Sequence, residues 1–338
     1  MTGKFDTGRR PPRNVADETR RGRYGRRHEV RITQVMFESG RSMWKAERVL
    51  SKTIRYTGTL ALSMAVITGC SSGASKSEPE KPSTAAEQSM TVKSGKDGIR
   101  LPEANASFDY QIGAPYTPPD GVRAVSRDRT AKPAPGLYNV CYVNAFQTQP
   151  NAKDIAWWKE KHDDLLLRND DGELVVDGPW KEPLLDVSDE DKRKDLLDII
   201  GPWVDGCATS GYDAVELDNL DSFERSQDML TKEDTAAFAK LLATRAHAKG
   251  LAVAQKNTTD LLDQRKDIGF DFAVAEECAH YKECPAFMKA YDNKVFAIEY
   301  EKKDYAAACK AWGKELSINL RDRDVHPPTK EDYVSERC

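Results

Sequence analysis

The chain has 338 residues, 31% of them charged and 39% hydrophobic, with a formal net charge of −4. The first 70 residues carry +9 (15 Lys+Arg, 6 Asp+Glu), so residues 71–338 carry −13. An acidic body argues against a nucleic-acid partner, because neutralising phosphates requires Lys and Arg, and it suits a cationic ligand. The length accommodates one α/β barrel of about 250 residues beside a leader.

Residues 56–69 are uncharged and follow a basic stretch, as in the n-region and h-region of a signal peptide. They are too few for a membrane span of about 20 apolar residues. The stretch ends in Ile67-Thr68-Gly69-Cys70, which resembles the bacterial lipobox, where the leader is cut before a cysteine that is then acylated. We expect 1–70 to be a basic extension and lipoprotein signal peptide, although a buried strand with an incidental cysteine is the alternative.

The mature protein is then expected to be exported and held at the cell surface by lipid on Cys70, its only contact with a membrane. Because 40 Arg-rich residues precede the signal, Met36 or Met43 is a better translation start than Met1. Residues 71–99 are rich in Ser, Pro, Glu and Lys and are expected to form a disordered linker. The folded domain is expected over 100–338.

Six further cysteines in an exported domain predict three disulfides, with fifteen possible connectivities. Proximity favours Cys278–Cys284. The position of Cys338 at the terminus favours Cys309–Cys338, and elimination leaves Cys141–Cys207. Cys278, His280 and Cys284 could instead hold zinc. No fourth ligand is apparent, and we predict no metal and no organic cofactor.

Eight strand-like runs follow residue 100, most of them succeeded by a helical stretch. The runs are Phe108–Ile112, Val122–Ser126, Tyr138–Asn144, Ala214–Asn219, Leu251–Asn257, Phe270–Glu276, Val295–Tyr300 and Leu316–Arg321; a further short strand is expected at 183–187. The helices are expected at Asp189–Cys207, Lys232–Lys249 and Asp304–Trp312. Thr231 and Asp234 predict the start of the second helix and Gly250 its end. Alternating strands and helices, eight times over, predict a single (β/α)8 TIM barrel domain.

Two of the strands, in segments 211–219 and 270–278, end in acids, which are costly to bury without a reason. Glu216 and Asp218 share one face of their strand. Asp218 lies nearer the carboxyl end, where barrel active sites lie, so it is the catalytic candidate and Glu216 its support. Glu276 is the candidate on the other strand, with Glu277 as the alternative because a bulge would reverse the facing. A salt-bridge or loop-capping role is the simpler explanation for any one acid.

Paired carboxylates facing one cleft are what glycoside hydrolysis requires, one as general acid and one as nucleophile or base. Serine or cysteine hydrolase chemistry is not supported, since no G-x-S-x-G elbow is present and the cysteines are expected to be paired. Aromatic residues are candidates for stacking on sugars, Trp180 among them. The residues expected to bind substrate are Asp186, Glu216, Asn219, Lys256, Asn257, Glu277, Tyr300, Trp157 and Trp158.

These segments resemble glycoside hydrolase family 114, the endo-α-1,4-polygalactosaminidase type, across 108–338. The two specific blocks are 215–221 (Val-Glu-Leu-Asp-Asn-Leu-Asp) and 270–278 (Phe-Asp-Phe-Ala-Val-Ala-Glu-Glu-Cys). The resemblance implies a (β/α)8 barrel that acts on α-1,4-linked, galactosamine-containing polysaccharide. It places the catalytic aspartate on Asp218 and the catalytic glutamate on Glu276.

The chain departs from the family where substrate should bind. Ala275 and Glu277 stand where members often carry Asn and Gln, and 144–150 replaces a Ser-Gly-Ser type loop. The reaction class therefore transfers better than the substrate. We expect an endo-acting hydrolase of a cationic, galactosamine-rich polysaccharide. The alternatives are a non-catalytic, cell-surface glycan-binding lipoprotein on the same barrel and a hydrolase of a different envelope or biofilm glycan.

Overall fold

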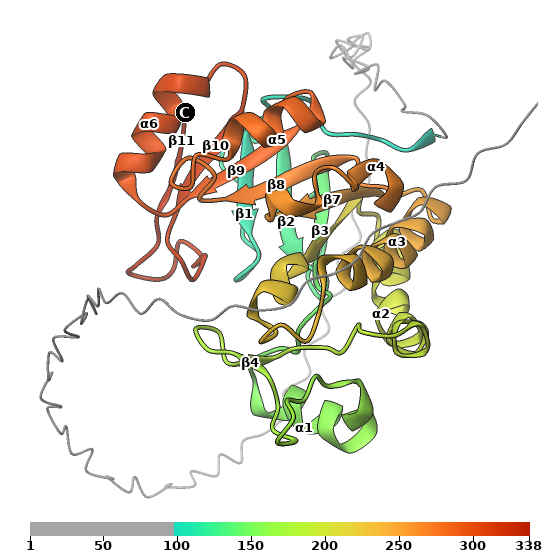
Figure 1. The fold of residues 1–338 in the computed structure, drawn as a ribbon. Coiled ribbons are helices and arrows are strands. Elements are labelled where there is room, and N and C mark those ends of the chain that lie inside the picture. The colour runs from blue at the N-terminus through green and yellow to red at the C-terminus, as the bar shows by residue number, and fades with distance from the viewer. Residues whose placement is uncertain (1–97) are drawn as a thin grey trace, which may run out of the picture. The chain divides into compact units, whose positions relative to one another are not determined.

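The computed structural model describes residues 98–338, so the predictions for the leader, Cys70 and nearly all of the linker lie outside the described residues. A nine-stranded sheet forms the centre of the fold, with the order β1-β2-β3-β6-β7-β8-β9-β10-β11 (Figure 1). Its first eight strands are parallel, and β11 runs antiparallel to β10. The strands are β1 (Phe108–Gln111), β2 (Ala124–Asp128), β3 (Tyr138–Asn144), β6 (Ala214–Asp218), β7 (Ala252–Lys256), β8 (Phe272–Glu276), β9 (Val295–Glu299), β10 (Ser317–Arg321) and β11 (Ser335–Arg337).

The sheet curls into a nearly closed barrel, which confirms the (β/α)8 prediction. The last gap lies between β10 and β1, where side chains replace the strand ladder. Asn319 Nδ2 donates to the Phe108 carbonyl at 2.8 Å, and Ser317 Oγ donates to the Ala106 carbonyl. All eight predicted strands are present as the eight parallel strands of this barrel.

Helices follow every barrel strand from β3 to β9, but none follows β1 or β2 among the described residues. The two connections at 112–123 and 129–137 are rich in proline, which lacks the N–H that a helix interior needs. The helices are α1 (Ala152–Lys161), α2 (Glu190–Ser210), α3 (Lys232–Ala248), α4 (Arg265–Ile268), α5 (Cys284–Tyr291) and α6 (Lys302–Trp312), with short 3-10 turns η2 (Asp163–Leu165), η3 (Leu220–Arg225) and η4 (Thr259–Leu261).

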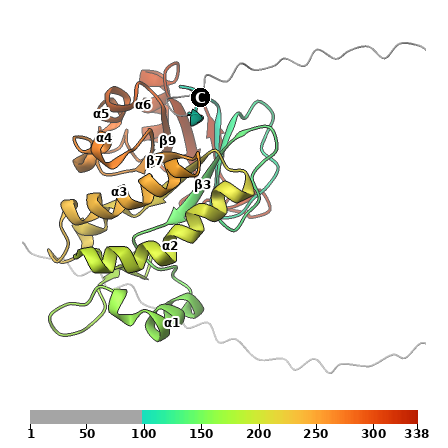
Figure 2. The ribbon, with the colours of Figure 1, turned by 90° about the vertical axis from the view of Figure 1, so that its right-hand side faces the viewer.

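The long helices α2 and α3 lie side by side on the outside of the barrel (Figure 2). The Asp189 side chain caps α2 by accepting from Lys192 N, and Gly211 ends it with φ 91°. Thr231 and Asp234 cap α3 reciprocally, as predicted. No described helix is long and apolar enough to cross a membrane.

Strand alternation divides the hydrophobic residues into two cores. On β6, Val215 and Leu217 face outward into the core beneath the helices. Ala214 faces inward, into a barrel interior that holds Phe272 and Phe296. Since side chains alternate along a strand, Glu216 and Asp218 face inward as well. By the same alternation Glu276, the last residue of β8, also faces inward. The acids at the ends of β6 and β8 therefore face the same region of the barrel interior.

Between β3 and α2 the chain leaves the barrel for an excursion over 145–189, which contains α1 and the two-stranded sheet of β4 (Val176–Asp177) and β5 (Glu182–Pro183) (Figure 1). The short strand expected at 183–187 belongs to this excursion. Leu184 and Leu185 form single bridges to Gln147 and Leu166.

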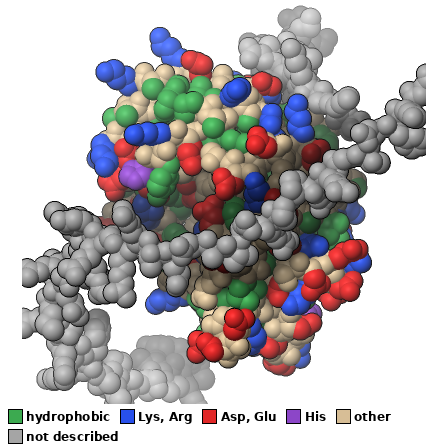
Figure 3. Space-filling view, viewed as in Figure 1, with side chains coloured by type: hydrophobic (Ala, Val, Ile, Leu, Met, Phe, Trp, Pro, Cys, Tyr) green, Lys and Arg blue, Asp and Glu red, His purple; other side chains and the backbone are tan. Residues whose placement is uncertain are grey.

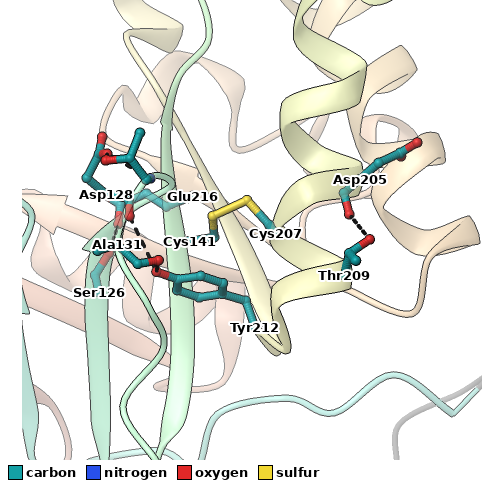
Figure 4. The surroundings of a disulfide bond; sticks show 10 residues. Ser126, Asp128, Ala131, Cys141, Asp205, Cys207, Thr209, Tyr212 and Glu216 are labelled. Atoms are coloured by element: carbon teal, nitrogen blue, oxygen red, sulfur yellow. Dashed lines mark hydrogen bonds between the residues drawn. A yellow bond between two sulfur atoms is a disulfide. The ribbon is translucent and has the colours of Figure 1, made fainter.

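Three disulfides are present, and they are the three pairs that proximity and elimination favoured: Cys141–Cys207, Cys278–Cys284 and Cys309–Cys338. The first joins β3 to α2 (Figure 4). The second occupies the sulfurs that the alternative zinc site would need as thiolates. His280 pairs instead with Asp304 at 2.9 Å.

Candidate active site

The candidate site is a cleft at the carboxyl ends of the barrel strands, where active sites of this fold lie. A cavity of about 340 Å³ is lined by residues that include Asp218, Lys256, Glu276 and Tyr300. A second cavity of about 710 Å³ adjoins it. Acidic side chains gather around the middle of the face shown in Figure 3. The residues that line both cavities, and so join them into one cleft, are Trp180, Asp221, Arg225, Asn257, Glu276, Tyr300 and Arg323.

Lys256, at the end of β7, is the centre of the site. Its ammonium nitrogen lies 3.2 Å from Glu216 Oε1, 3.1 Å from Asp218 Oδ1 and 3.3 Å from Glu276 Oε2. Its side chain is only 2% exposed. Burial alone would lower the pKa of Lys256, but the three carboxylates raise it well above its ordinary value. A permanent cation therefore holds three acids from two strands around one point.

Asp218, on β6, is held by two hydrogen bonds besides its contact with Lys256. Its Oδ2 accepts from the Tyr142 hydroxyl at 2.6 Å, and its Oδ1 accepts from the Asn219 backbone N–H at 2.8 Å. Burial pushes the pKa of Asp218 upward, but Lys256 and these hydrogen bonds outweigh it and hold the pKa below its ordinary value. Asp218 is thus an oriented, ionised carboxylate at the cavity.

Glu216 lies beneath it, fully buried. It accepts from the Tyr110 hydroxyl at 2.9 Å and from the Ser126 hydroxyl at 2.7 Å. Burial raises the pKa of Glu216, even though Lys256 opposes the shift. Glu216 does not line either cavity. It touches Lys256 rather than the space that a substrate would fill.

Glu276, on β8, is oriented by two neighbours. Asn257 Nδ2 donates to Glu276 Oε2 at 3.0 Å, and Asn257 Oδ1 accepts from the Glu276 backbone N–H at 2.8 Å. The Tyr300 hydroxyl donates to Oε1. Burial raises the pKa of Tyr300 well above its ordinary value, so this hydroxyl keeps the proton it donates. The second acid is therefore held as Asp218 is, but it is more accessible, at 22% exposed against 16%.

Glu277 lies beside it but points elsewhere. Its φ of 55° turns the chain, and its carboxylate pairs with both terminal nitrogens of Arg323, at 2.8 and 3.2 Å. The Arg323 guanidinium in turn lies 4.9 Å from the centre of the Tyr300 ring. Glu277 lines only the larger cavity, whereas Glu276 lines both. Of the two adjacent acids, it is Glu276 that contacts Lys256 and shares the smaller cavity with Asp218.

The backbone is strained where these strands end. Four non-glycine residues have left-handed φ values there: Asn219 at 69°, Asn257 at 51°, Thr258 at 44° and Glu277 at 55°. Such conformations persist only where surrounding contacts impose them, and they cluster at functional sites. Here each lies within two residues of the end of β6, β7 or β8.

Three residues expected to bind substrate lie elsewhere. Asp186 pairs with Lys192 and accepts from the Ser188 N–H. Trp158, on α1, is 1% exposed in the outer core, and Trp157 packs edge-on against it. None of the three lines either cavity. Asn219, Lys256, Asn257 and Tyr300 do line the smaller cavity.

Other side chains at the site were not anticipated. Tyr142 holds Asp218, and Tyr110 holds Glu216. Strand alternation could have predicted this. Tyr142 lies two residues before Asn144, the last residue of β3, so both side chains face inward. Glu182 and Arg225 line the smaller cavity from the excursion and from η3, where local sequence carries no comparable signal. Trp180, in contrast, was expected as a sugar-stacking residue; it is half exposed and lines both cavities.

Glu299 ends β9 but belongs to the support of the site. Its Oε1 accepts from the Ala279 N–H at 2.8 Å, while its Oε2 is buried without a partner among the described residues. Burial raises the pKa of Glu299 from 4.5 to about 7. The folded state therefore binds this proton more tightly than the unfolded chain does, and the free energy of unfolding falls as pH rises from about 4.5 to 7.

Glutamine mimics the protonated acid. We therefore expect Glu299→Gln to remove the decrease in unfolding free energy with rising pH. At pH 8 the free energy of unfolding of the variant should be about 1–3 kcal/mol higher than that of the wild type, and near pH 4 the two should be equal. Urea titrations at several pH values measure the difference, with Glu301→Gln as the exposed control. Parallel stability profiles for wild type and Glu299→Gln would contradict the assignment.

Comparison with protein-family models matches residues 88–338 to glycoside-hydrolase family GH114. Among solved structures, Ega3 of Aspergillus fumigatus, in complex with galactosamine, shares 22% identity and a TM-score of 0.57, covering 70% of this chain and 97% of Ega3. The glycoside hydrolase domain of PelA from Pseudomonas aeruginosa shares 15% identity and a TM-score of 0.46, covering 68% and 97%. A comparison with curated proteins gave no match.

Proposed function

Because the chain belongs to glycoside-hydrolase family GH114, we propose that it is an endo-acting hydrolase of an α-1,4-linked, galactosamine-containing polysaccharide. Asp218 and Glu276 are its two catalytic carboxylates. One observation carries this assignment: the two acids are the last, inward-facing residues of β6 and β8, the strands on either side of β7, and both contact the Lys256 nitrogen and line the same cavity. No other pair of acids on the described strands shares that arrangement.

The environments of the two acids divide their roles. Asp218 is kept ionised by Lys256 and its hydrogen bonds, which suits a nucleophile. Glu276, the more accessible, would donate its proton to the leaving glycosidic oxygen. Since one nitrogen lies 3.1 Å from one carboxylate and 3.3 Å from the other, the nearest oxygens are at most about 6.4 Å apart. Carboxyl groups about 5–5.5 Å apart are typical of retaining enzymes, and those of inverting enzymes lie about 6.5–9.5 Å apart, so this close approach favours the retaining arrangement.

We therefore propose retention of anomeric configuration. Asp218 attacks the anomeric carbon while Glu276 protonates the leaving oxygen, and a covalent glycosyl-enzyme forms. Water then adds to the anomeric carbon as Glu276 takes its proton, which releases Asp218. Proton NMR of the first-formed product distinguishes the outcomes: an α anomer supports this sequence, and a β anomer would replace it with single-step inversion.

The charge of the cleft supports a cationic glycan. Among the described residues that line the two cavities, eleven are acidic and three are basic. Such a concentration of like charge attracts a polymer of free amino sugars over long range. The relative Ega3 was solved with galactosamine bound. Trp180 and Tyr281, 50% and 62% exposed at the edges of the cleft, offer faces for sugar rings beyond the catalytic pair.

The test is product release from partially deacetylated α-1,4-galactosaminogalactan by residues 88–338. Oligosaccharides of several lengths support endo-hydrolysis, and turnover should weaken as salt rises because exposed charges are screened beyond about 10 Å at 0.1 M. Binding without turnover would favour the glycan-binding alternative. Cleavage of other envelope glycans alone would favour a different substrate. Salt-independent turnover would contradict the electrostatic part of the proposal.

We further propose that the protein is exported and anchored at the cell surface through acylated Cys70. The three disulfides support export, because such bonds persist in oxidising compartments. Metabolic labelling with a fatty acid should mark the wild type and not Cys70→Ala. Equal labelling of both proteins would exclude this anchor.

A further inference from the structure

Glu182 is a carboxylate of the smaller cavity that the catalytic roles leave unused. It lies on β5, in the excursion, and lines the same cavity as Asp218 and Glu276. The two residues that follow it are held in place by segment 147–148. The Thr148 N–H donates to the Pro183 carbonyl at 2.9 Å, and Leu184 bridges Gln147. The excursion thus presents a fixed acid to the site from outside the barrel.

The protein offers this acid only neutral partners. Asn144 Nδ2 donates to Glu182 Oε2 at 3.1 Å. The Gln147 amide, in the orientation that satisfies both of its polar atoms, donates to the same oxygen at 2.9 Å. None of the Lys and Arg residues in the described part of the chain forms an ion pair with Glu182. The nearby Arg225 pairs instead with Asp177 at 2.7 Å and with Asp221 at 2.8 Å.

Glu182 therefore lacks a counterion. Burial raises the pKa of Glu182 to about 7, and repulsion from Asp218 and Asp177 adds to this effect. The hydrogen bond from Asn144 and the attraction of Arg225 oppose the shift but do not cancel it. A carboxylate in this state gains more from an arriving cation than an exposed one does, because its charge is poorly solvated. Oε1 accepts no hydrogen bond from the described residues, so it is available to a ligand.

We propose that Glu182 is the specificity-determining acceptor for the ammonium group of a 2-amino sugar bound in the cavity shared by Asp218 and Glu276. This rests on the proposed function and deepens it, by assigning the preference for deacetylated residues to one side chain. An N-acetyl group carries no charge and is larger. Binding it would desolvate Glu182 without supplying a cation, and that leaves a polar group unpaired.

The test compares kcat/KM on oligosaccharides of equal length, fully deacetylated or fully N-acetylated, for wild type and Glu182→Gln. Glutamine keeps the size of the side chain and an oxygen for Asn144 and Gln147, and removes only the charge. We expect KM for the deacetylated substrate to rise about 10- to 100-fold with little change in kcat, and kcat/KM for the acetylated one to stay equal or rise. Glu182→Asp should restore part of the preference, and exposed Glu173→Gln should not alter it.

A substrate preference that is the same in wild type and Glu182→Gln overturns the inference, as does an equal loss on both substrates. Thermal unfolding monitors the fold, and the variant should be at least as stable as the wild type because it loses a poorly solvated charge. If Glu182→Gln fails to fold, Glu182→Ala, which also removes the charge, decides by the same ratio. Failure of the wild type to cleave either substrate contradicts the proposed function itself, so the two failures are distinguishable.

Discussion

Asp218→Asn is expected to lower kcat on the polysaccharide by at least about 10³-fold, because the amide cannot attack the anomeric carbon. Asparagine keeps an oxygen for the Asn219 N–H, and its NH2 group can donate to the Tyr142 hydroxyl, so the fold should survive. Glu276→Gln is expected to lower kcat by about 10²–10⁴-fold, the usual contribution of a general acid. Reducing-end release in the steady state measures both effects.

Variants at the two positions, Asp218→Ala and Glu276→Gln, should differ in how they are rescued. Azide, a small anionic nucleophile, should restore turnover to Asp218→Ala and yield a glycosyl azide of inverted configuration. Substrates with an activated aryl leaving group should need no proton from residue 276 and should rescue Glu276→Gln. Asp205→Asn is the matched control, since that acid pairs with Arg245 on the outer helices. Turnover above one-tenth of wild type in Asp218→Asn would remove it from the reaction.

Lys256→Met is expected to lower both stability and activity. It leaves Glu216, fully buried, with two hydroxyl donors and no cation. Breaking a buried pair in this way costs about 3–5 kcal/mol of unfolding free energy. The loss should shrink as pH falls, because the pKa of Glu216 is already raised by burial and protonation would remove the uncompensated charge.

The double variant Glu216→Gln/Lys256→Met separates the two effects. Stability should largely return, because the buried charge is gone with its partner. Activity should not return, since Asp218 and Glu276 still lack the cation that holds them and lowers the pKa of Asp218. The acid limb of the pH–rate profile should accordingly shift to higher pH. An unshifted profile with normal kcat would confine Lys256 to a structural role.

Part of the site was predictable because strand parity and parallel topology are local rules. Once β6 and β8 were recognised, Asp218 and Glu276 had to lie at the same end of the barrel. Asp186 shows where the rule stops. We expected a strand at 183–187, but β5 covers only Glu182–Pro183 and belongs to a separate two-stranded sheet. Asp186 therefore does not end a strand of the barrel. Trp157 and Trp158 lie on α1 and line neither cavity, a placement that the local sequence does not specify.

The sequence by itself predicted the eight strands, the barrel and Asp218 and Glu276 as candidate acids, with Glu277 left as the alternative, because apolar runs and strand alternation act over short distances along the chain. It favoured the three disulfide pairs by proximity, terminal position and elimination. Only the tertiary structure decided which acid of the 276–277 pair meets Asp218, since a single left-handed φ turns Glu277 away. It also decided that Lys256 joins three carboxylates and that Glu182 enters from the excursion. Those contacts join residues distant in sequence, and their strength depends on burial, which no local pattern encodes.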